Sequence, residues 1–193
     1  TSYSAHQLNR HVISLEDPVE NIQSHLLQIQ VNERSGITYA LGLKAILRHS
    51  PDVIMIGEIR DLETAQAAVQ ASLTGHLVIT TVHAKNPVGC LYRLMDLGIP
   101  IDDLKHAILG ITSQQLVITS FDREKDRLIP NRSSLYEILY GNTLEEAFEA
   151  IKAGTTFNMP IESTLYNQYE RGVKMSSIQL STTTYLSKGL SNT

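Results

Sequence analysis

Cysteine is almost absent from this chain of 193 residues, which has Cys90 alone. One cysteine excludes an intramolecular disulfide framework and a zinc site built from several cysteines. It favours a reducing, cytoplasmic setting. Long apolar runs are also missing, because the longest uninterrupted one is Val53-Ile54-Met55-Ile56. A bilayer requires roughly 20 such residues, so the sequence predicts no transmembrane helix.

Positive charge is in slight deficit, with 16 Lys+Arg against 20 Asp+Glu and a net charge of −4. This balance argues against a nucleic-acid surface that depends on bulk positive charge, and we expect no direct nucleic-acid binding. Hydrophobic residues make up 42% and charged residues 19%. Those fractions are typical of a globular protein with a buried core.

Short apolar runs alternate with helical patterns over the first two-thirds of the chain. The predicted strands are 11–16, 52–58 and 76–83, and the predicted helices are 37–48, 61–75, 86–98 and 102–109. In the second helix, one apolar stripe is predicted from Leu62, Ala65, Val69 and Leu73, with Asp61 as its N-cap. Alternation of this kind predicts the α/β class, with a mainly parallel sheet covered by helices.

The pattern changes toward the C-terminus. Two strands, 115–121 and 135–140, are expected around the charged turn 122–127. Residues 143–146 read as a capping box for a helix that ends near Gly154, and a second helix is predicted over 162–171. We therefore expect a core over 1–120 and a small, mostly helical C-terminal subdomain over 121–180. The Ser- and Thr-rich tail, 181–193, is expected to be disordered.

Glu58 follows the apolar strand directly, beside Gly57, which leaves room for a ligand. A carboxylate at the tip of a buried strand is typical of the Walker B strand of nucleotide hydrolases. There it positions Mg²⁺ through water or orients the water that attacks a γ-phosphate. The alternative is an ordinary buried strand followed by a helix cap at Asp61.

Three carboxylates, Glu16, Asp17 and Glu20, lie within five residues at the end of another strand. Such clusters are usually solvated acidic turns. The functional interpretation places Glu16 beside Glu58 across neighbouring strand tips, where a metal or a phosphate site would relieve their repulsion.

His76 and His83 flank the third predicted strand. Seven residues apart on a straight strand, their side chains point to opposite faces, so a shared metal is disfavoured. His83 lies at the strand end that carries ligands in parallel sheets, where a neutral imidazole can sense a γ-phosphate. His76 lies at the other end, where a role in the core or in a cap is sufficient.

Four ordered segments together resemble the secretion-ATPase superfamily, and more closely the assembly-type ATPases of type II secretion, type IV pili and competence systems. Residues 13–20 are similar to the Asp box, and 30–40 to the segment before Walker B. Residues 47–65 resemble an atypical Walker B, with Gly57 where most P-loop enzymes have Asp. Residues 74–83 resemble the His box. The resemblance covers about residues 10–120.

This resemblance implies a RecA-like P-loop NTPase core in a homo-hexameric ring, peripheral at the cytoplasmic face of the membrane. ATP hydrolysis would drive pilus or pseudopilus assembly with a polytopic membrane platform protein. It assigns Glu58 as the Walker B carboxylate, and Glu16 with Asp17 near Mg²⁺ or the attacking water. His76 and His83 become the His-box pair, and Arg60 helps to hold the region together.

Two departures from the family pattern follow. No Gly-x-x-x-x-Gly-Lys-Ser/Thr loop occurs in the chain. The chain opens at Thr1 without a methionine before Met55, so we expect a piece of a longer protein whose P-loop precedes Thr1. The Cys₄ zinc insert of many assembly-type members cannot form, so no zinc is expected. This fits the competence type of Gram-positive bacteria or the retraction type, and residues 30–32 (Gln-Val-Asn) favour assembly.

Two other functions stay open at this point. The chain could be a natural scaffold without a P-loop that docks to a motor ring or a membrane platform. It could also be a metal-dependent hydrolase that uses Glu16, Glu58 and a histidine.

Overall fold

The computed structural model describes residues 4–5, 9–120, 130–160 and 164–174. The chain divides into two compact units. The first comprises the described residues up to Ala84, together with Gly89–Ile108. The second comprises Lys85–Val88 and the described residues from Leu109 onward.

The first unit contains a four-stranded parallel sheet. Its strands are β1 (Val12–Glu16), β2 (Leu27–Gln30), β3 (Val53–Ile56) and β4 (Leu77–Thr80), in the spatial order β2-β1-β3-β4. Strands β1, β3 and β4 lie within the three predicted strands, and the predicted α/β class with a parallel sheet is confirmed. Strand β2 was not predicted.

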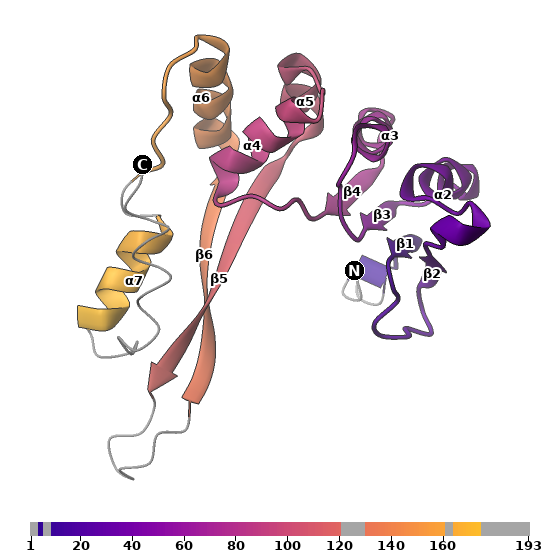
Figure 1. Ribbon diagram of the computed structural model, residues 1–193, viewed down its shortest axis with the longest axis horizontal. Helices are drawn as coiled ribbons and strands as arrows, with labels where there is room; N and C mark the ends of the chain where they lie inside the picture. The colour runs from indigo at the N-terminus through magenta and orange to yellow at the C-terminus, as the bar shows by residue number, and fades with distance from the viewer. Residues whose placement is uncertain (1–3, 6–8, 121–129, 161–163, 175–193) are drawn as a thin grey trace. The chain divides into compact units, whose positions relative to one another are not determined.

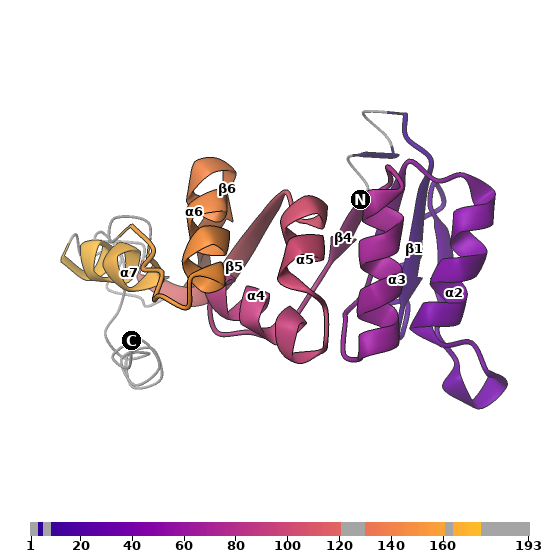
Figure 2. The same ribbon diagram turned by 90° about the horizontal axis from the view of Figure 1, so that it is seen from above.

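Two helices, α2 (Tyr39–Ile46) and α3 (Leu62–Leu73), lie side by side on one face of this sheet (Figures 1 and 2). Beneath them the central strands contribute fully buried side chains, namely Ile13, Leu15, Ile54 and Ile56. Helix α2 packs closely on β1 at Gly42, where an added Cβ would lie 2.8 Å from Leu15 Cδ1. The core of the unit therefore sits between these helices and the sheet.

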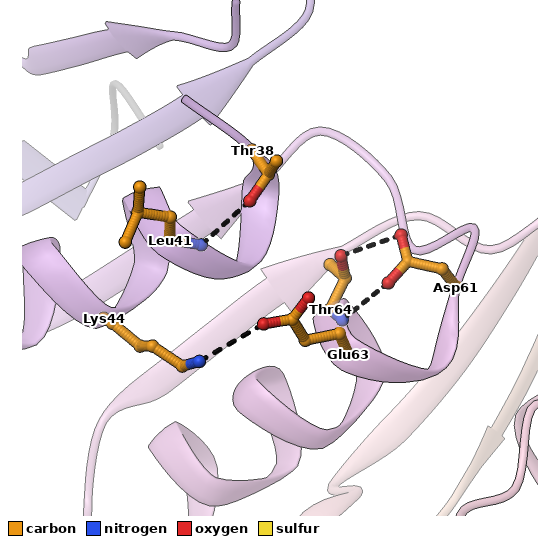
Figure 3. A network of polar contacts seen from close by, with 6 residues as sticks. All are labelled: Thr38, Leu41, Lys44, Asp61, Glu63 and Thr64. Atoms are coloured by element: carbon orange, nitrogen blue, oxygen red, sulfur yellow. Dashed lines mark hydrogen bonds and ion pairs between the residues drawn. The ribbon is translucent and has the colours of Figure 1, made fainter. Parts of the chain in front are cut away.

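Helix α3 begins as predicted but buries a different face. Asp61 is its N-cap, and its carboxylate accepts hydrogen bonds from Thr64 N at 2.8 Å and Thr64 Oγ1 at 3.0 Å (Figure 3). The predicted stripe is wrong at its ends, because Leu62 is 41% exposed and Leu73 is 46% exposed. The buried residues are Thr64, Ala65, Ala68 and Ala71. Small side chains let the helix approach its neighbours closely, so the alanine row faces the core.

The remaining helices of the first half are shorter than the sequence pattern suggested. Helix α2 starts after Thr38, whose hydroxyl accepts a hydrogen bond from Leu41 N at 3.2 Å (Figure 3), and a 3-10 turn, η2 (Leu47–His49), follows it. A second 3-10 turn, η1 (Glu33–Ser35), precedes α2. Helices α4 (Pro87–Asp96) and α5 (Ile101–Ala107) correspond to the predicted helices 86–98 and 102–109.

The second unit is built on a long antiparallel pair, β5 (Gly110–Ser120) and β6 (Pro130–Tyr140). Helices α6 (Gly141–Lys152) and α7 (Leu165–Lys174) complete it. Because β5 pairs with β6 along its whole length, the division between the units falls before β5, whereas the sequence pattern placed it after residue 120. The predicted turn 122–127 and tail 181–193 lie outside the described residues.

The predicted capping box of α6 is not formed. The β5–β6 ladder continues to Tyr140, which is the N-cap residue and provides no side-chain hydrogen bond to the helix. Gly141, with φ of +55°, then turns the chain directly from strand into helix. Thr143 therefore lies inside the first turn, two residues after the helix has begun. No helix in the described part of the chain has the length and apolar character needed to cross a membrane.

Candidate functional site

The carboxyl ends of the parallel strands meet at one edge of the first unit's sheet, and predicted site residues gather there. Glu16 ends β1, Gly57 and Glu58 follow β3, and His83 comes shortly after β4. Strands β1 and β3 are neighbours, and a Cβ built on Gly57 would lie 3.7 Å from Glu16 Cα. The structure thus brings Glu16 and Glu58 to the same sheet edge on adjacent strands.

Glu58 is the centre of a small charged cluster. Its Oε1 accepts a hydrogen bond from Arg60 Nη2 at 2.5 Å, and its Oε2 lies 3.3 Å from His83 Nε2. The Glu58 side chain is only 15% exposed, whereas the Arg60 and His83 side chains are 63% and 87% exposed. The carboxylate is therefore held from one side while the imidazole remains open to solvent.

Two hydrogen bonds explain how His83 reaches this position. Thr81 Oγ1 donates to the carbonyl oxygen of Gly57 at 2.6 Å, and Ile59 N donates to the carbonyl oxygen of Thr81 at 3.0 Å. They tie the segment after β4 to the segment after β3, beyond the ends of both strands. His83, two residues after Thr81, therefore lies beside Glu58.

The second oxygen of Glu58 is a buried acceptor without a hydrogen bond from any described residue. The hydrogen bond from Arg60 lowers the pKa of Glu58, and the charge of Arg60 and the contact with His83 act in the same direction, against the effect of burial. Glu58 is therefore ionised at neutral pH. This oxygen belongs to an ionised carboxylate, accepts no hydrogen bond and has only the exposed His83 imidazole at 3.3 Å among the described residues, so it fits a site that takes a cation or a polarised water molecule.

Glu16 is held differently. Its Oε1 accepts hydrogen bonds from Ser14 Oγ at 2.5 Å and from Gln28 Nε2 at 3.0 Å. Ser14 is fully buried in β1, two residues before Glu16, and Gln28 comes from β2. These two donors fix one carboxylate oxygen, while Oε2 has no hydrogen bond among the described residues.

Asp17 is exposed and lines a cavity of about 470 Å³ at the ends of β1 and β2. The cavity is lined by Asp17, Gln30, Val31, Asn32, Glu33 and Arg34. It therefore combines residues of the predicted Asp box with those of the segment that precedes Walker B. Asp17 belongs both to this cavity and to the predicted site.

His76 lies at the opposite end of β4 from His83. Its Nδ1 is 3.1 Å from the carbonyl oxygen of Ala71 and 3.3 Å from Thr74 Oγ1, at the C-terminal end of α3. The imidazole thus closes the end of a helix, which is the structural role that the sequence left open for it. The structure does not bring His76 to Glu58.

The carboxylates suit a nucleotide-bound Mg²⁺ ion better than a metal held by protein ligands alone. Among the described residues, no group of three or more His, Cys, Asp or Glu side chains is arranged to hold a metal. Mg²⁺ is typically bound by one or two carboxylates, with water and phosphate oxygens as its other ligands. Glu58 Oε2 and Glu16 Oε2, which accept no hydrogen bond from a described residue, fit that requirement.

Sequence reasoning missed two residues at this edge. Tyr39, at the start of α2, lies so close to Gly57 that an added Cβ would be 2.8 Å from its hydroxyl oxygen. Nothing in the local pattern around Tyr39 indicates this long-range contact. The sequence could have indicated Ser14. It is the polar residue inside the run Val-Ile-Ser-Leu-Glu, and side chains two residues apart on a strand share a face, so Ser14 lies on the same face as Glu16.

Comparison with known proteins gives a consistent result. A family model described as "Type II/IV secretion system protein" matches residues 2–168. Competence protein ComGA of Bacillus subtilis is 42% identical over 160 residues, covering 78% of this chain and 45% of that protein. Type II secretion system ATPase E of Vibrio cholerae is 46% identical over 143 residues, covering 69% and 28%. The chain thus spans less than half the length of these relatives.

Solved structures with a similar fold include a pilus retraction motor and an ATPase. The pilus retraction motor PilT, solved with bound ADP, matches with a TM-score of 0.64 and 29% identity, over 88% of this chain and 50% of that one. The ATPase DotB of Yersinia pseudotuberculosis matches with a TM-score of 0.65 and 26% identity, over 93% and 49%. The described α/β architecture is therefore similar to that of PilT and DotB.

Proposed function

The chain belongs to the family of type II/IV secretion system proteins, and from this premise we propose that it forms part of the catalytic core of an ATP-hydrolysing motor. The observation that carries the proposal is Glu58, an ionised carboxylate whose buried Oε2 accepts no hydrogen bond from a described residue and lies 3.3 Å from the exposed His83 imidazole. It stands at the carboxyl edge of a parallel sheet, where ligands bind in such folds.

The side chains at this edge take separate roles in the proposal. Glu58 orients or deprotonates the water that attacks the γ-phosphate. Glu16, fixed by Ser14 and Gln28, and Asp17 lie toward Mg²⁺, which neutralises phosphate charge when it is bound with ATP. Arg60 keeps Glu58 ionised and in place. His83 lies nearest the γ-phosphate, and the assignment of His76 to the same site has no geometric support.

The biological role is proposed from the relatives. Two of them are named for competence and for type II secretion, at 42% and 46% identity. We therefore favour a motor that assembles a pilus or pseudopilus for DNA uptake or secretion. Its whole protein works as a homo-hexamer at the cytoplasmic face of the membrane, with a polytopic platform protein. PilT, at 29% identity, supports retraction as the second candidate.

The test is the substitution Glu58→Gln in the whole protein that contains this chain. Glutamine keeps the shape of the side chain and an acceptor for Arg60, but it cannot remain ionised. We expect kcat for ATP hydrolysis to fall by about 100-fold or more, while the Kd for nucleotide stays within a few fold. Phosphate release and fluorescent-nucleotide binding measure these two quantities.

Glu63→Gln is the matched control, since Glu63 is an exposed residue of α3 whose carboxylate pairs with Lys44 at 3.2 Å (Figure 3). It is expected to leave kcat unchanged. If the wild-type whole protein neither binds nor hydrolyses ATP and forms a stable ring without nucleotide, the scaffold function replaces this one. Hydrolysis that persists in Glu58→Gln would remove Glu58 from the chemistry.

A further inference from the structure

Tyr39 fills the space that a side chain at position 57 would occupy. Its hydroxyl oxygen would be 2.8 Å from a Cβ built on Gly57, which is closer than real Cβ atoms approach other heavy atoms. The residue starts α2 and is 9% exposed, so packing fixes its ring. A side chain at position 57 would therefore force the Tyr39 hydroxyl, on a largely buried ring, to move.

The charges of the candidate site surround this hydroxyl. Burial raises the pKa of Tyr39, the carboxylates of Asp17, Glu58 and Glu16 raise it further, and the Arg60 guanidinium opposes them. The hydroxyl is therefore protonated at neutral pH. Among the residues that the structure describes, it makes no hydrogen bond, although its neighbourhood is rich in acceptors.

We propose that Tyr39 is a positioning residue of this site, whose hydroxyl takes the place of a residue-57 side chain and hydrogen-bonds a water molecule held beside Glu58. Glu58 Oε2 has the contact with His83 Nε2 at 3.3 Å but accepts no hydrogen bond from a described residue, and the Tyr39 hydroxyl makes none, so one water bridging toward both satisfies two groups. That water is either a ligand of Mg²⁺ or the water that attacks ATP. The inference rests on the proposed function.

The test compares Tyr39→Phe with Tyr92→Phe in the whole protein. Both substitutions remove one hydroxyl, and Tyr92 lies on α4 with 43% of its surface exposed. We expect Tyr39→Phe to reduce kcat by about tenfold with an unchanged melting temperature. Tyr92→Phe should change neither quantity.

The Mg²⁺ dependence of nucleotide binding identifies the water. A higher half-saturating Mg²⁺ concentration in Tyr39→Phe assigns the hydroxyl to a metal-bound water. A lower kcat with unchanged Mg²⁺ dependence assigns it to the attacking water. If Tyr39→Phe matches Tyr92→Phe in both quantities, the proposal is overturned.

A double-substitution cycle tests the placement without any activity. Gly57→Ala should lower the melting temperature strongly, because its Cβ meets the Tyr39 hydroxyl, and markedly less in the Tyr39→Phe background. Additive effects would show that the hydroxyl does not occupy this space. The cycle remains decisive even if the whole protein has no ATPase activity, so failure of this inference is distinguishable from failure of the proposed function.

Discussion

Glu137 is a buried carboxyl in the second unit, with a 6% exposed side chain on β6. No described residue donates a hydrogen bond to it. Burial raises the pKa of Glu137 above its ordinary value. The folded protein thus binds this proton more tightly than the unfolded chain does, so stability falls as the pH rises through the folded-state pKa.

We therefore expect Glu137→Gln to stabilise the protein at neutral pH, because it removes the cost of a buried ionised group. The free energy of unfolding at pH 7 should rise by on the order of 1 kcal/mol. The gain should disappear at pH 4, below the carboxyl's unfolded pKa, where the wild-type carboxyl is already protonated. Urea unfolding followed by circular dichroism measures both values, and the exposed Glu20→Gln should show no gain at either pH.

Some residues of the candidate site could be predicted from the sequence and others could not. Glu16 ends one apolar strand and Glu58 lies two residues after another, so a local pattern places them at one sheet edge. Tyr39 could not be predicted, because its proximity to Gly57 depends on how α2 packs over the sheet. His76 shows the converse, since it belongs to a recognisable motif but its ring bonds the end of α3.

Among the helices and strands, α3 has the clearest local signal for where it begins, namely its N-cap residue Asp61. Both carboxylate oxygens of Asp61 are used, one by Thr64 N and one by Thr64 Oγ1 (Figure 3). Loss of an N-cap leaves an unsatisfied N–H group and removes a negative charge from the positive end of the helix dipole.

Asp61→Ala is expected to lower the free energy of unfolding by about 1 kcal/mol. Asp61→Asn should cost less, because its side-chain oxygen can still accept from Thr64 N. Urea midpoints of the two variants and the wild type measure the difference. Equal midpoints for alanine and wild type would mean that solvent replaces the cap without loss.

Element boundaries were less predictable than element type. Strand β2 has the short sequence Leu-Gln-Ile-Gln at a sheet edge, where half-exposed positions leave a weak pattern. In helix α3 the predicted stripe ends in two exposed leucines, because close packing instead buries Thr64, Ala65, Ala68 and Ala71. Helix α6 starts at Gly141 because the strand pairing before it, which no local motif encodes, extends to Tyr140.

At the scale of the whole molecule, the residues that act on ATP in the proposal are present without the loop that holds its phosphates. No Gly-x-x-x-x-Gly-Lys-Ser/Thr sequence occurs in the 193 residues. Such a loop supplies several backbone N–H donors and a lysine to the phosphates. The carboxylates of Glu16, Asp17 and Glu58 repel the phosphates unless those charges are compensated.

We therefore expect the purified 193-residue chain to bind Mg-ATP poorly and to release no phosphate above the buffer rate. A longer protein that includes a P-loop should bind Mg-ATP and hydrolyse it. In that protein, Glu58→Gln should abolish hydrolysis but leave nucleotide binding intact. Fluorescent-nucleotide titration and phosphate release, run on both proteins at equal concentration, measure the difference. Turnover by the 193-residue chain that disappears in its own Glu58→Gln variant would contradict the prediction. It would mean that this sheet edge recruits the phosphates without a P-loop.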